Sequence, residues 1–269
     1  MVAEEGDSRR RHLGTTEPPP LVVIAHADSS HARRLLHALI TEGLPPRAVL
    51  MASPWAELAR LRRRTAMYIR RVGTRETLSR IRHRLTAHRT PAGTELPPLA
   101  EIAARHRVRL VRYRSLADES TMALLSGLRP VLVVLAGAPI LRQAFIDVPS
   151  LGVVNAHPAL LPDARGMDVV EWSVVGGIPP GVTVHLVERG VDSGPIVLRR
   201  SLSGPLPRTI GGLREAIEKQ AAEMMVEAVR GLLSGTLVPR AQDSEGTTYA
   251  AMPSRLRRQV DEILGRGGA

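Results

Sequence analysis

The sequence predicts an α/β fold built on a doubly wound, mainly parallel β-sheet. Short apolar runs rich in Val, Ile and Leu, such as residues 21–27 (LVVIAHA) and 130–136 (PVLVVLA), indicate buried parallel strands. Amphipathic stretches that begin with helix-capping residues separate these runs. Strands that alternate with helices are typical of a sheet covered by helices on both faces. Because only 2% of the residues are aromatic, we expect Leu, Val, Ile and Ala to fill the core.

A βαβ unit is expected over residues 21–52. The polar side chains of residues 28–30 are suitable N-caps for a helix over residues 31–42, and Gly43 is suited to ending that helix. A second strand is expected over residues 47–52. A strand, a helix and a strand within about 30 residues form the repeating unit of a parallel sheet.

The rest of the chain continues this alternation without an internal repeat or an interdomain linker. We expect helices over residues 55–88, 99–106, 116–128 and 207–233, and strands over residues 108–111, 130–136, 153–156, 182–187 and 196–200. These elements predict one Rossmann-like domain over residues 21–249, with an Arg-rich helical insert at about residues 55–89. Residues 1–20 are expected to be a disordered leader, and residues 250–269 a short C-terminal extension.

Composition restricts the possible classes of function. The 269 residues suffice for a large core, and the absence of cysteine excludes disulfides, thiolate nucleophiles and cysteine-ligated metals. The formal charge of +11 favours an anionic partner, nucleic acid included, although an Arg-rich composition can also reflect the genome. No apolar run is long enough to span a membrane and the N-terminus has no apolar signal core, so we expect a cytoplasmic protein with no membrane partner.

Polar side chains follow two of the expected strands. Asn155 and His157 are two residues apart, so in extended backbone they point to the same side of the sheet. They lie at the carboxyl end of a strand, where open α/β sheets bind ligands. Asp192 follows another strand on a glycine-bounded loop, where a carboxylate could orient or charge the imidazole. These residue types indicate acid–base chemistry with an oxyanion stabiliser, although each residue alone is more often structural.

Two linked motifs resemble the formyltransferase family. Residues 155–166 (NAHPALLPDARG) resemble the family signature Asn-x-His-Pro-Ser-Leu-Leu-Pro-x-x-x-Gly, with Ala159 in place of the usual Ser. Residues 181–197 (GVTVHLVERGVDSGPIV) resemble its Gly-Val-Thr-Val-His…Asp-x-Gly-Pro-Ile segment. Residues 129–141 and 239–249 resemble the segments that precede the signature and end the family's catalytic domain.

The resemblance implies a catalytic trio and a folate donor. Asn155, His157 and Asp192 would catalyse transfer of a formyl group from 10-formyltetrahydrofolate to an amine through a tetrahedral oxyanion. Asn155 and protonated His157 would stabilise the oxyanion, while Asp192 would orient His157 and take up the amine proton. No His, Asp or Glu cluster has metal-ligand spacing, so no catalytic metal is expected. By resemblance, the pterin pocket would be built from two segments: Leu135, Ala136, Gly137, Ala138, Pro139, Ile140, Leu141, Glu188 and Val191.

The acceptor is the least specified part of this hypothesis. The family's tRNA enzyme has a C-terminal β-barrel domain, and the residues after Tyr249 are too few to form one. The family's glycinamide ribonucleotide enzyme has a Gly-rich first loop, whereas residues 25–34 contain no glycine. We therefore expect a small specialised acceptor, such as an amino sugar, an amino acid derivative or a natural-product intermediate, with an anionic group as one option. Five residues are candidates for contacting it: His26, Ser29, Ser30, Arg165 and Gly166.

Other interpretations of the sequence remain open. The chain could hydrolyse 10-formyltetrahydrofolate or catalyse another transfer reaction. It could instead be a basic module that binds nucleic acid or a carrier protein through the insert, which has eleven arginines between Trp55 and Arg89. Residues 209–233 and 250–265 could support a homodimer. His185 is expected to pack inside or point outward rather than to join the site.

Overall fold

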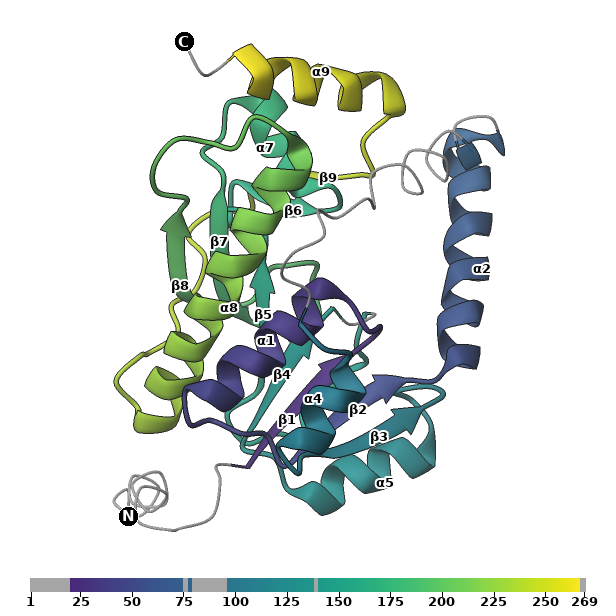
Figure 1. Cartoon of the computed structure of the whole chain (residues 1–269), viewed down its shortest axis with the longest axis vertical. Coiled ribbons are helices and arrows are strands. Elements are labelled where there is room, and N and C mark those ends of the chain that lie inside the picture. Colours follow the sequence, from purple (N-terminus) through teal and green to yellow (C-terminus); the bar gives the residue numbers. More distant parts are fainter. Residues whose placement is uncertain (1–19, 75–76, 79–95, 138–139, 267–269) are drawn as a thin grey trace.

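A seven-stranded sheet with the order β3-β2-β1-β4-β5-β7-β8 forms the centre of the molecule (Figure 1). The computed structural model describes residues 20–74, 77–78, 96–137 and 140–266. The strands are β1 (Leu21–Ala25), β2 (Ala48–Ala52), β3 (Arg109–Tyr113), β4 (Leu132–Ala136), β5 (Val153–His157), β7 (Gly181–Leu186) and β8 (Ile196–Ser201). The five strands from β3 to β5 are parallel, whereas β7 and β8 are antiparallel to their neighbours. This is the mainly parallel α/β sheet that the sequence predicts.

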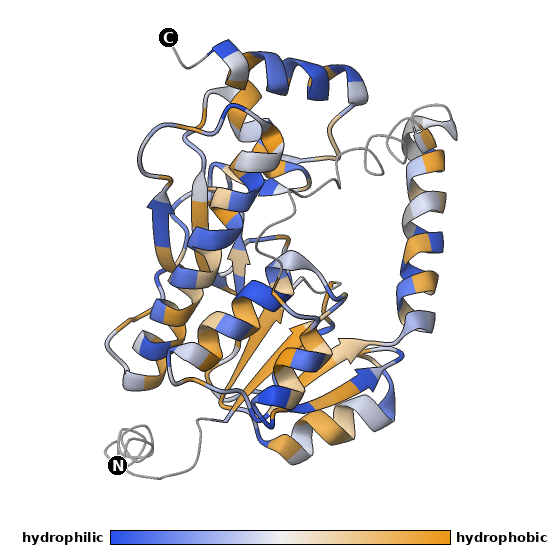
Figure 2. Ribbon diagram, viewed as in Figure 1, coloured by the Kyte–Doolittle hydropathy of each residue, from blue (hydrophilic) through white to orange (hydrophobic). Residues whose placement is uncertain are grey.

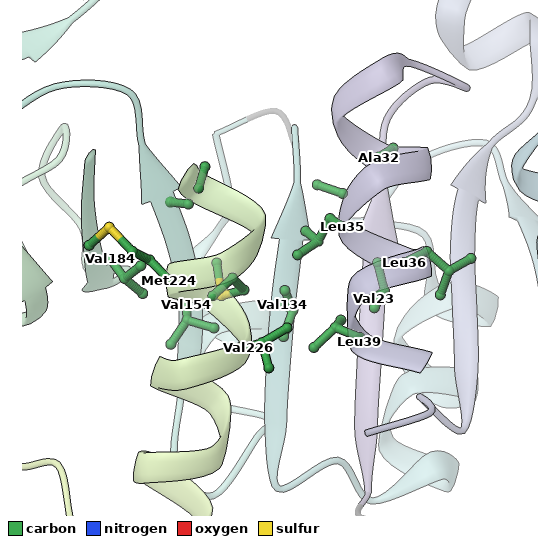
Figure 3. Close-up of a cluster of buried hydrophobic side chains, with 14 of the residues drawn as sticks. Val23, Ala32, Leu35, Leu36, Leu39, Val134, Val154, Val184, Met224 and Val226 are labelled. Carbon is green, nitrogen blue, oxygen red and sulfur yellow. The ribbon is translucent and has the colours of Figure 1, made fainter. Parts of the chain in front are cut away.

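Helices cover both faces of the sheet, which explains why its central strands are apolar at every position. Alternate residues of β1 belong to two separate cores, with Val23 in one and Val22 in the other. The first core packs against α1 (Ser30–Thr41), α4 (Leu99–Arg105) and α8 (Ile210–Ser234). Figure 3 shows α1 and α8 contributing Leu35, Leu39 and Met224 to this layer. The second core packs against α5 (Glu119–Leu128) and α6 (Gln143–Ile146).

The helix boundaries follow from their capping residues. The Ser29 hydroxyl accepts the Ala32 N–H at the start of α1, and the Thr209 hydroxyl accepts the Gly212 N–H at the start of α8. Gly235, in the left-handed region, ends α8. The expected helix over residues 207–233 is therefore confirmed with a shift of a few residues, because Thr209 rather than Pro207 caps it.

The segment after β9 folds back onto the domain. A two-stranded sheet joins β6 (Ala164–Gly166) to β9 (Thr247–Tyr249), and α9 (Ser254–Arg266) then packs against α7 (Val169–Gly176). Val260 and Leu264 of α9 belong to the first core, and Arg257 forms an ion pair of 2.6 Å with Asp168. Residues 250–266, which we expected to be a short extension, thus contribute to the core of the domain.

The helix α2 (Pro54–Val72) carries most of the described part of the Arg-rich insert. It projects from the edge of the sheet at the end of β2 (Figure 1), and polar and apolar residues alternate along it (Figure 2). Trp55 is 72% exposed, and Arg60, Arg62 and Arg63 are exposed as well. The expected helix over residues 55–88 is observed here to residue 72, while residues 79–95 and the expected leader at 1–19 lie outside the described residues. None of the helices in the described part of the chain is long and apolar enough to cross a membrane.

Candidate active site

The strand β5 brings Asn155 and His157 to the carboxyl end of the sheet. Asn155 lies opposite Leu135 of β4 on one side and opposite His185 of β7 on the other. Since side chains two apart in a strand share a face, Asn155 and His157 both face the same side as His185. The sequence predicted that Asn155 and His157 share a face. The antiparallel register of β7 adds His185 to that face.

His157 is held by a backbone carbonyl and a carboxylate. It is 3% exposed, and its Nε2–H donates to the Ala164 carbonyl oxygen at 2.8 Å. Because a carbonyl only accepts, this bond fixes the proton on Nε2 and turns Nδ1 toward Asp192, whose Oδ2 is 3.5 Å away. A neutral ring would present a lone pair to the carboxylate there. The His157–Asp192 pair is therefore arranged to hold one additional proton.

Asp192 reaches His157 because two residues with positive φ, Asp192 and Gly166, lie side by side. Its own φ of 51° lies in the left-handed region, and the Gly166 N–H donates to Asp192 Oδ2 at 3.0 Å. A side chain at Gly166 would place its Cβ 2.4 Å from the Tyr249 carbonyl oxygen, and the φ of 95° independently disfavours other residues. Gly166 is thus required for the close backbone approach that lets its N–H meet the carboxylate.

His185 joins the site as a neutral acceptor. Its Nδ1–H donates to the Leu186 carbonyl oxygen at 2.8 Å, so Nε2 has a free lone pair. Burial, with its desolvation, lowers the pKa of His185 to about 4, so the ring is neutral at physiological pH. The Asn155 Nδ2 lies 3.3 Å from this Nε2 and donates to it. His185 therefore fixes which way the Asn155 amide faces, a role that we did not expect from the sequence.

Opposing effects act on the protonation of His157. Burial lowers its pKa, the Asp192 carboxylate and the Ala164 carbonyl raise it, and the Arg165 guanidinium lowers it. The same arginine lowers the pKa of His185. Asp192 thus favours the imidazolium form of His157, against the effects of burial and of the Arg165 cation on β6.

The loop between His157 and Gly166 is fixed by one hydroxyl. Thr183, buried in β7, donates its hydroxyl to the Ala159 carbonyl and accepts the Leu161 N–H, at 2.8 and 2.9 Å. The side chain of Ala159 is fully buried in a small cluster with Ala164 and Val169. An apolar side chain suits this position, which explains how the loop keeps its place without the usual serine hydroxyl.

The segments predicted to bind the donor lie on either side of Asn155. Leu135 and Ala136 are buried within β4, and Leu141 packs against the second core. Ile140 is 92% exposed, and Val191, on the loop that carries Asp192, is half exposed. Glu188 and Gly137 are exposed too, whereas Ala138 and Pro139 lie outside the described residues. Two exposed apolar side chains thus belong to the segments that were predicted to bind the donor.

The residues predicted to contact the acceptor divide into two groups. Arg165 and Gly166 lie beside Asp192, as described. His26, Ser29 and Ser30 lie at the end of β1, which is separated from β5 by β4. The Ser29 hydroxyl caps α1, and the Ser30 hydroxyl donates to Glu218 Oε2 at 2.9 Å. Both hydroxyls are therefore already engaged within the protein.

His26 is the exception in this second group. It is 6% exposed, its Nδ1 lies 3.4 Å from the Tyr113 hydroxyl, and its Nε2 has no hydrogen-bond partner among the described residues. Burial and then the Arg60 charge lower the pKa of His26 to about 4, while burial raises the pKa of Tyr113 to about 12. The phenol keeps its proton and donates it to Nδ1, which leaves His26 with an unused Nε2–H donor.

The part of the chain that the structure describes contains no candidate metal site. No group of three or more His, Cys, Asp or Glu side chains there is arranged to hold a metal ion. The imidazoles and the carboxylate of the site instead contact one another and backbone atoms.

Comparison with known proteins identifies the family. A family model described as formyl transferase matches residues 20–229. The chain belongs to the formyl transferase family. Among curated relatives, methionyl-tRNA formyltransferase from Trichlorobacter lovleyi is 31% identical over 167 residues, which are 61% of this chain and 53% of the relative. The enzyme of the same name from Aromatoleum aromaticum is 33% identical over 183 residues, 66% of this chain and 58% of the relative. The chain thus spans little more than half the length of these relatives.

Solved structures support the formyl transferase fold. Phosphoribosylglycinamide formyltransferase from Anaplasma phagocytophilum aligns over 87% of this chain and 100% of its own, with a TM-score of 0.58 and 17% identity. A likely sugar N-formyltransferase from Mycobacterium tuberculosis aligns over 91% of this chain and 86% of its own, with a TM-score of 0.55 and 16% identity. At these identities the likeness establishes the fold, and the acceptor must be argued from the site.

Proposed function

We propose that this formyl transferase family member transfers a formyl group from 10-formyltetrahydrofolate to the amine of a small acceptor. One observation carries the proposal. Asn155, His157 and Asp192 come from two segments of the chain and lie together at the carboxyl end of β5, with Asp192 Oδ2 3.5 Å from His157 Nδ1. An amide donor beside an acid–base pair is the arrangement that acyl transfer to an amine requires.

Asn155 stabilises the negative charge that develops on the formyl oxygen. One hydrogen of its amide nitrogen is directed to His185, so the second is available for the oxyanion. Preorganised donors of this kind are worth about 2.7–4 kcal/mol in enzymes where one has been removed. Because His185 is neutral, it holds the amide without competing for the oxyanion's charge.

Asp192 and His157 accept and donate the protons that move during the reaction. A bond forms between the acceptor nitrogen and the formyl carbon, and the bond from that carbon to the folate nitrogen breaks. Asp192 accepts the proton that the amine loses, and the His157–Asp192 pair returns a proton to the folate nitrogen as it leaves. The overall exchange leaves the protonation of the enzyme unchanged.

The residues around the site fit a folate donor. The exposed Ile140 and Val191 offer apolar contacts for a flat ring, and the site lies where parallel sheets bind ligands. The folate derivative supplies the activated formyl group when bound. Residues 135–141 and the loop from Glu188 to Val191 are the segments that we propose to hold it.

The acceptor is proposed to bind toward the end of β1. The Nε2–H of His26 is buried and unused, so we propose that a shift of the side chains around it opens this donor to an oxygen of the acceptor, while Arg165 beside Asp192 carries a positive charge. A neutral donor in a buried setting discriminates well between ligands that do and do not offer an acceptor atom. We therefore favour small amines that carry carboxylate, phosphate or sugar oxygens.

Calorimetry and product analysis test this function together. The purified chain should bind 10-formyltetrahydrofolate and deformylate it slowly, and a panel of amino sugar nucleotides and amino acid derivatives should contain an amine that accelerates turnover and becomes N-formylated. Rapid deformylation with no formylated product would instead identify a hydrolase. Absence of donor binding would contradict the proposal.

A tRNA-linked amine is the second candidate acceptor. The relatives described above are methionyl-tRNA formyltransferases, and α2 exposes Arg60, Arg62, Arg63 and Arg70 along one helix. Adding methionyl-tRNA to the same panel decides between the two acceptor classes. Formylation that weakens steeply as salt rises would favour tRNA, since phosphate contacts release counterions.

A further inference from the structure

We propose that Gln242 is a positioning residue that holds Asp192 against His157 by closing a ring of hydrogen bonds through Arg165. The inference rests on the proposed function for its catalytic meaning, whereas the geometry of the ring does not depend on it. Gln242 lies between α8 and β9, far along the chain from both signature segments.

Gln242 fastens the backbone of the loop that carries Asp192. Its side-chain Nε2 donates to two carbonyl oxygens, that of Asp192 at 2.9 Å and that of Gly194 at 2.8 Å. The two hydrogens of one amide nitrogen therefore hold the loop on either side of Ser193. The loop also lies tightly against β7, where a Cβ on Gly194 would be 1.9 Å from the Leu186 carbonyl oxygen.

The other end of the Gln242 amide holds Arg165. Its Oε1 accepts from Arg165 Nη2 at 2.6 Å, and the same Nη2 donates to the Ser244 carbonyl at 3.1 Å. The residue after Arg165 is Gly166, whose N–H donates to Asp192 Oδ2 at 3.0 Å. The path therefore runs from the Asp192 carboxylate through Gly166, Arg165 and Gln242 back to the Asp192 carbonyl.

This ring constrains both ends of one residue. Asp192 adopts a left-handed backbone conformation, which Asp tolerates better than most residues other than glycine but which still costs energy, so the surrounding contacts help to maintain it. Gly166 fixes the carboxylate and Gln242 fixes the carbonyl, and only together do they set the 3.5 Å approach of Oδ2 to His157 Nδ1. Without Gln242, we expect the backbone to relax and the carboxylate to withdraw from the imidazole.

The ring also places the charges that face His157. Asp192, the Ala164 carbonyl and Arg165 are the groups that shift its pKa besides burial, and His185 lies beside them at the same carboxylate. The effect of Asp192 is larger than that of Arg165, and we expect Arg165 to keep its contact with the Ser244 carbonyl when Gln242 is replaced. Withdrawal of Asp192 should therefore dominate the response of His157.

Two substitutions of Gln242 and one matched control test the ring. Gln242→Leu removes all three contacts, whereas Gln242→Glu keeps an acceptor for Arg165 and loses both donors. Gln220 is the control, because its Nε2 also bridges two successive carbonyl oxygens, those of Arg200 and Ser201, at 3.3 and 3.1 Å. Gln220→Leu thus removes a similar pair of bonds at a distance from the site.

The primary readout is the titration of His157 by NMR of the ligand-free protein, which requires no activity. We expect its midpoint to fall in Gln242→Leu, to fall less in Gln242→Glu, whose added carboxylate beside Arg165 acts in the opposite direction, to rise in Arg165→Met, where a neighbouring cation is lost, and to stay unchanged in Gln220→Leu. With donor and acceptor present, kcat should fall about 10- to 100-fold in both Gln242 variants, with the donor KM changed less than about twofold.

Two outcomes would overturn the proposal. One is an unchanged His157 midpoint in Gln242→Leu, or in Gln242→Met if the leucine variant does not fold. The other is a Gln242→Leu variant that loses activity and thermal stability only as much as Gln220→Leu does. If the wild-type chain fails to transfer formyl groups, the proposed function falls, while the titration still decides whether Gln242 positions Asp192.

Discussion

The two ends of the sheet's carboxyl edge are built differently. At the β5–β7 end, Asn155, His157 and Asp192 each form a hydrogen bond with His185 or with a backbone group. At the β1–β3 end, His26 keeps a buried Nε2 with no partner among the described residues, and α2 exposes Trp55 to solvent. The first end is therefore internally hydrogen-bonded, as the proposed chemistry requires, whereas the second retains a donor that we propose the acceptor uses.

Removing the carboxylate should have the largest effect on the first end. Asp192→Ala takes away both the proton acceptor and the partner of His157, so we expect kcat to fall by about 10³-fold or more. Steady-state kinetics with the formylated acceptor as product provides the measurement. Asp192→Asn, which keeps the shape but not the charge, should be nearly as impaired. Retention of near-wild-type kcat by either variant would remove Asp192 from the mechanism.

Removing the oxyanion donor should have the next largest effect. Asn155→Ala should lower kcat by about 10²- to 10³-fold, in line with the loss of one preorganised donor, and should leave the donor KM nearly unchanged. The ratio of kcat to KM separates this loss from a binding defect. An increase in KM with kcat intact would mean that Asn155 binds the ground state only.

His185 should contribute chiefly through Asn155. His185→Leu removes the acceptor that orients the amide, so we expect a loss of about 10-fold in kcat, the value of one hydrogen bond of about 1.4 kcal/mol. His185→Gln returns an acceptor and should recover much of the loss. In the double variant with Asn155→Ala most of the His185 effect should vanish, and full additivity would contradict the coupling.

At the second end, His26 should govern acceptor binding. His26→Leu removes the unused donor, so the acceptor KM should rise about 5- to 10-fold while the donor KM and the slow amine-free deformylation stay as in the wild type. Ser30→Ala is the control from the same segment, because its hydroxyl is engaged by Glu218. Equal effects of the two variants would argue against a specific contact by His26.

The smallest expected effect is on the pH dependence of the free energy of unfolding. The pKa of His26 is lowered to about 4 in the folded chain, so between pH 6.5 and 4 the unfolded state binds a proton that the folded state does not. The stability that neutral His26 contributes is therefore present above pH 6.5 and is lost as the pH falls. His26→Leu should lose about 2–3 kcal/mol less than the wild type between pH 7.5 and 4.5 in urea unfolding. Parallel losses would show that the pKa of His26 is not lowered.

Sequence patterns captured the first end better than the second. Asn155 and His157 are two residues apart in a strand, so the sequence alone predicts that their side chains share one face of the sheet. Gly166 and Asp192 follow from the motif, yet the reason that they meet, a close approach to Tyr249 of β9, depends on a strand pairing that no local pattern reveals. His185 looked like an ordinary buried strand residue because its partner is set by register.

The second end depends on contacts between distant segments. Tyr113 meets His26 from β3, across 87 positions of the chain, and Arg60 acts on both from α2. The strand over residues 108–111 was expected to end before Tyr113, so the phenol was not considered as part of a site. Likewise, the helix α9 was not predicted. It has few apolar residues, and these become buried only through packing against α7 and α8.

The most direct test of the account is a single-turnover comparison of wild-type and Asp192→Ala chains with saturating 10-formyltetrahydrofolate and the best amine of the panel. The account predicts rapid appearance of the N-formylated amine with the wild type and at least about a 10³-fold slower appearance with the variant, although both bind the donor. Equal rates, or no formylated amine from the wild-type chain, would contradict the claim that this site transfers formyl groups.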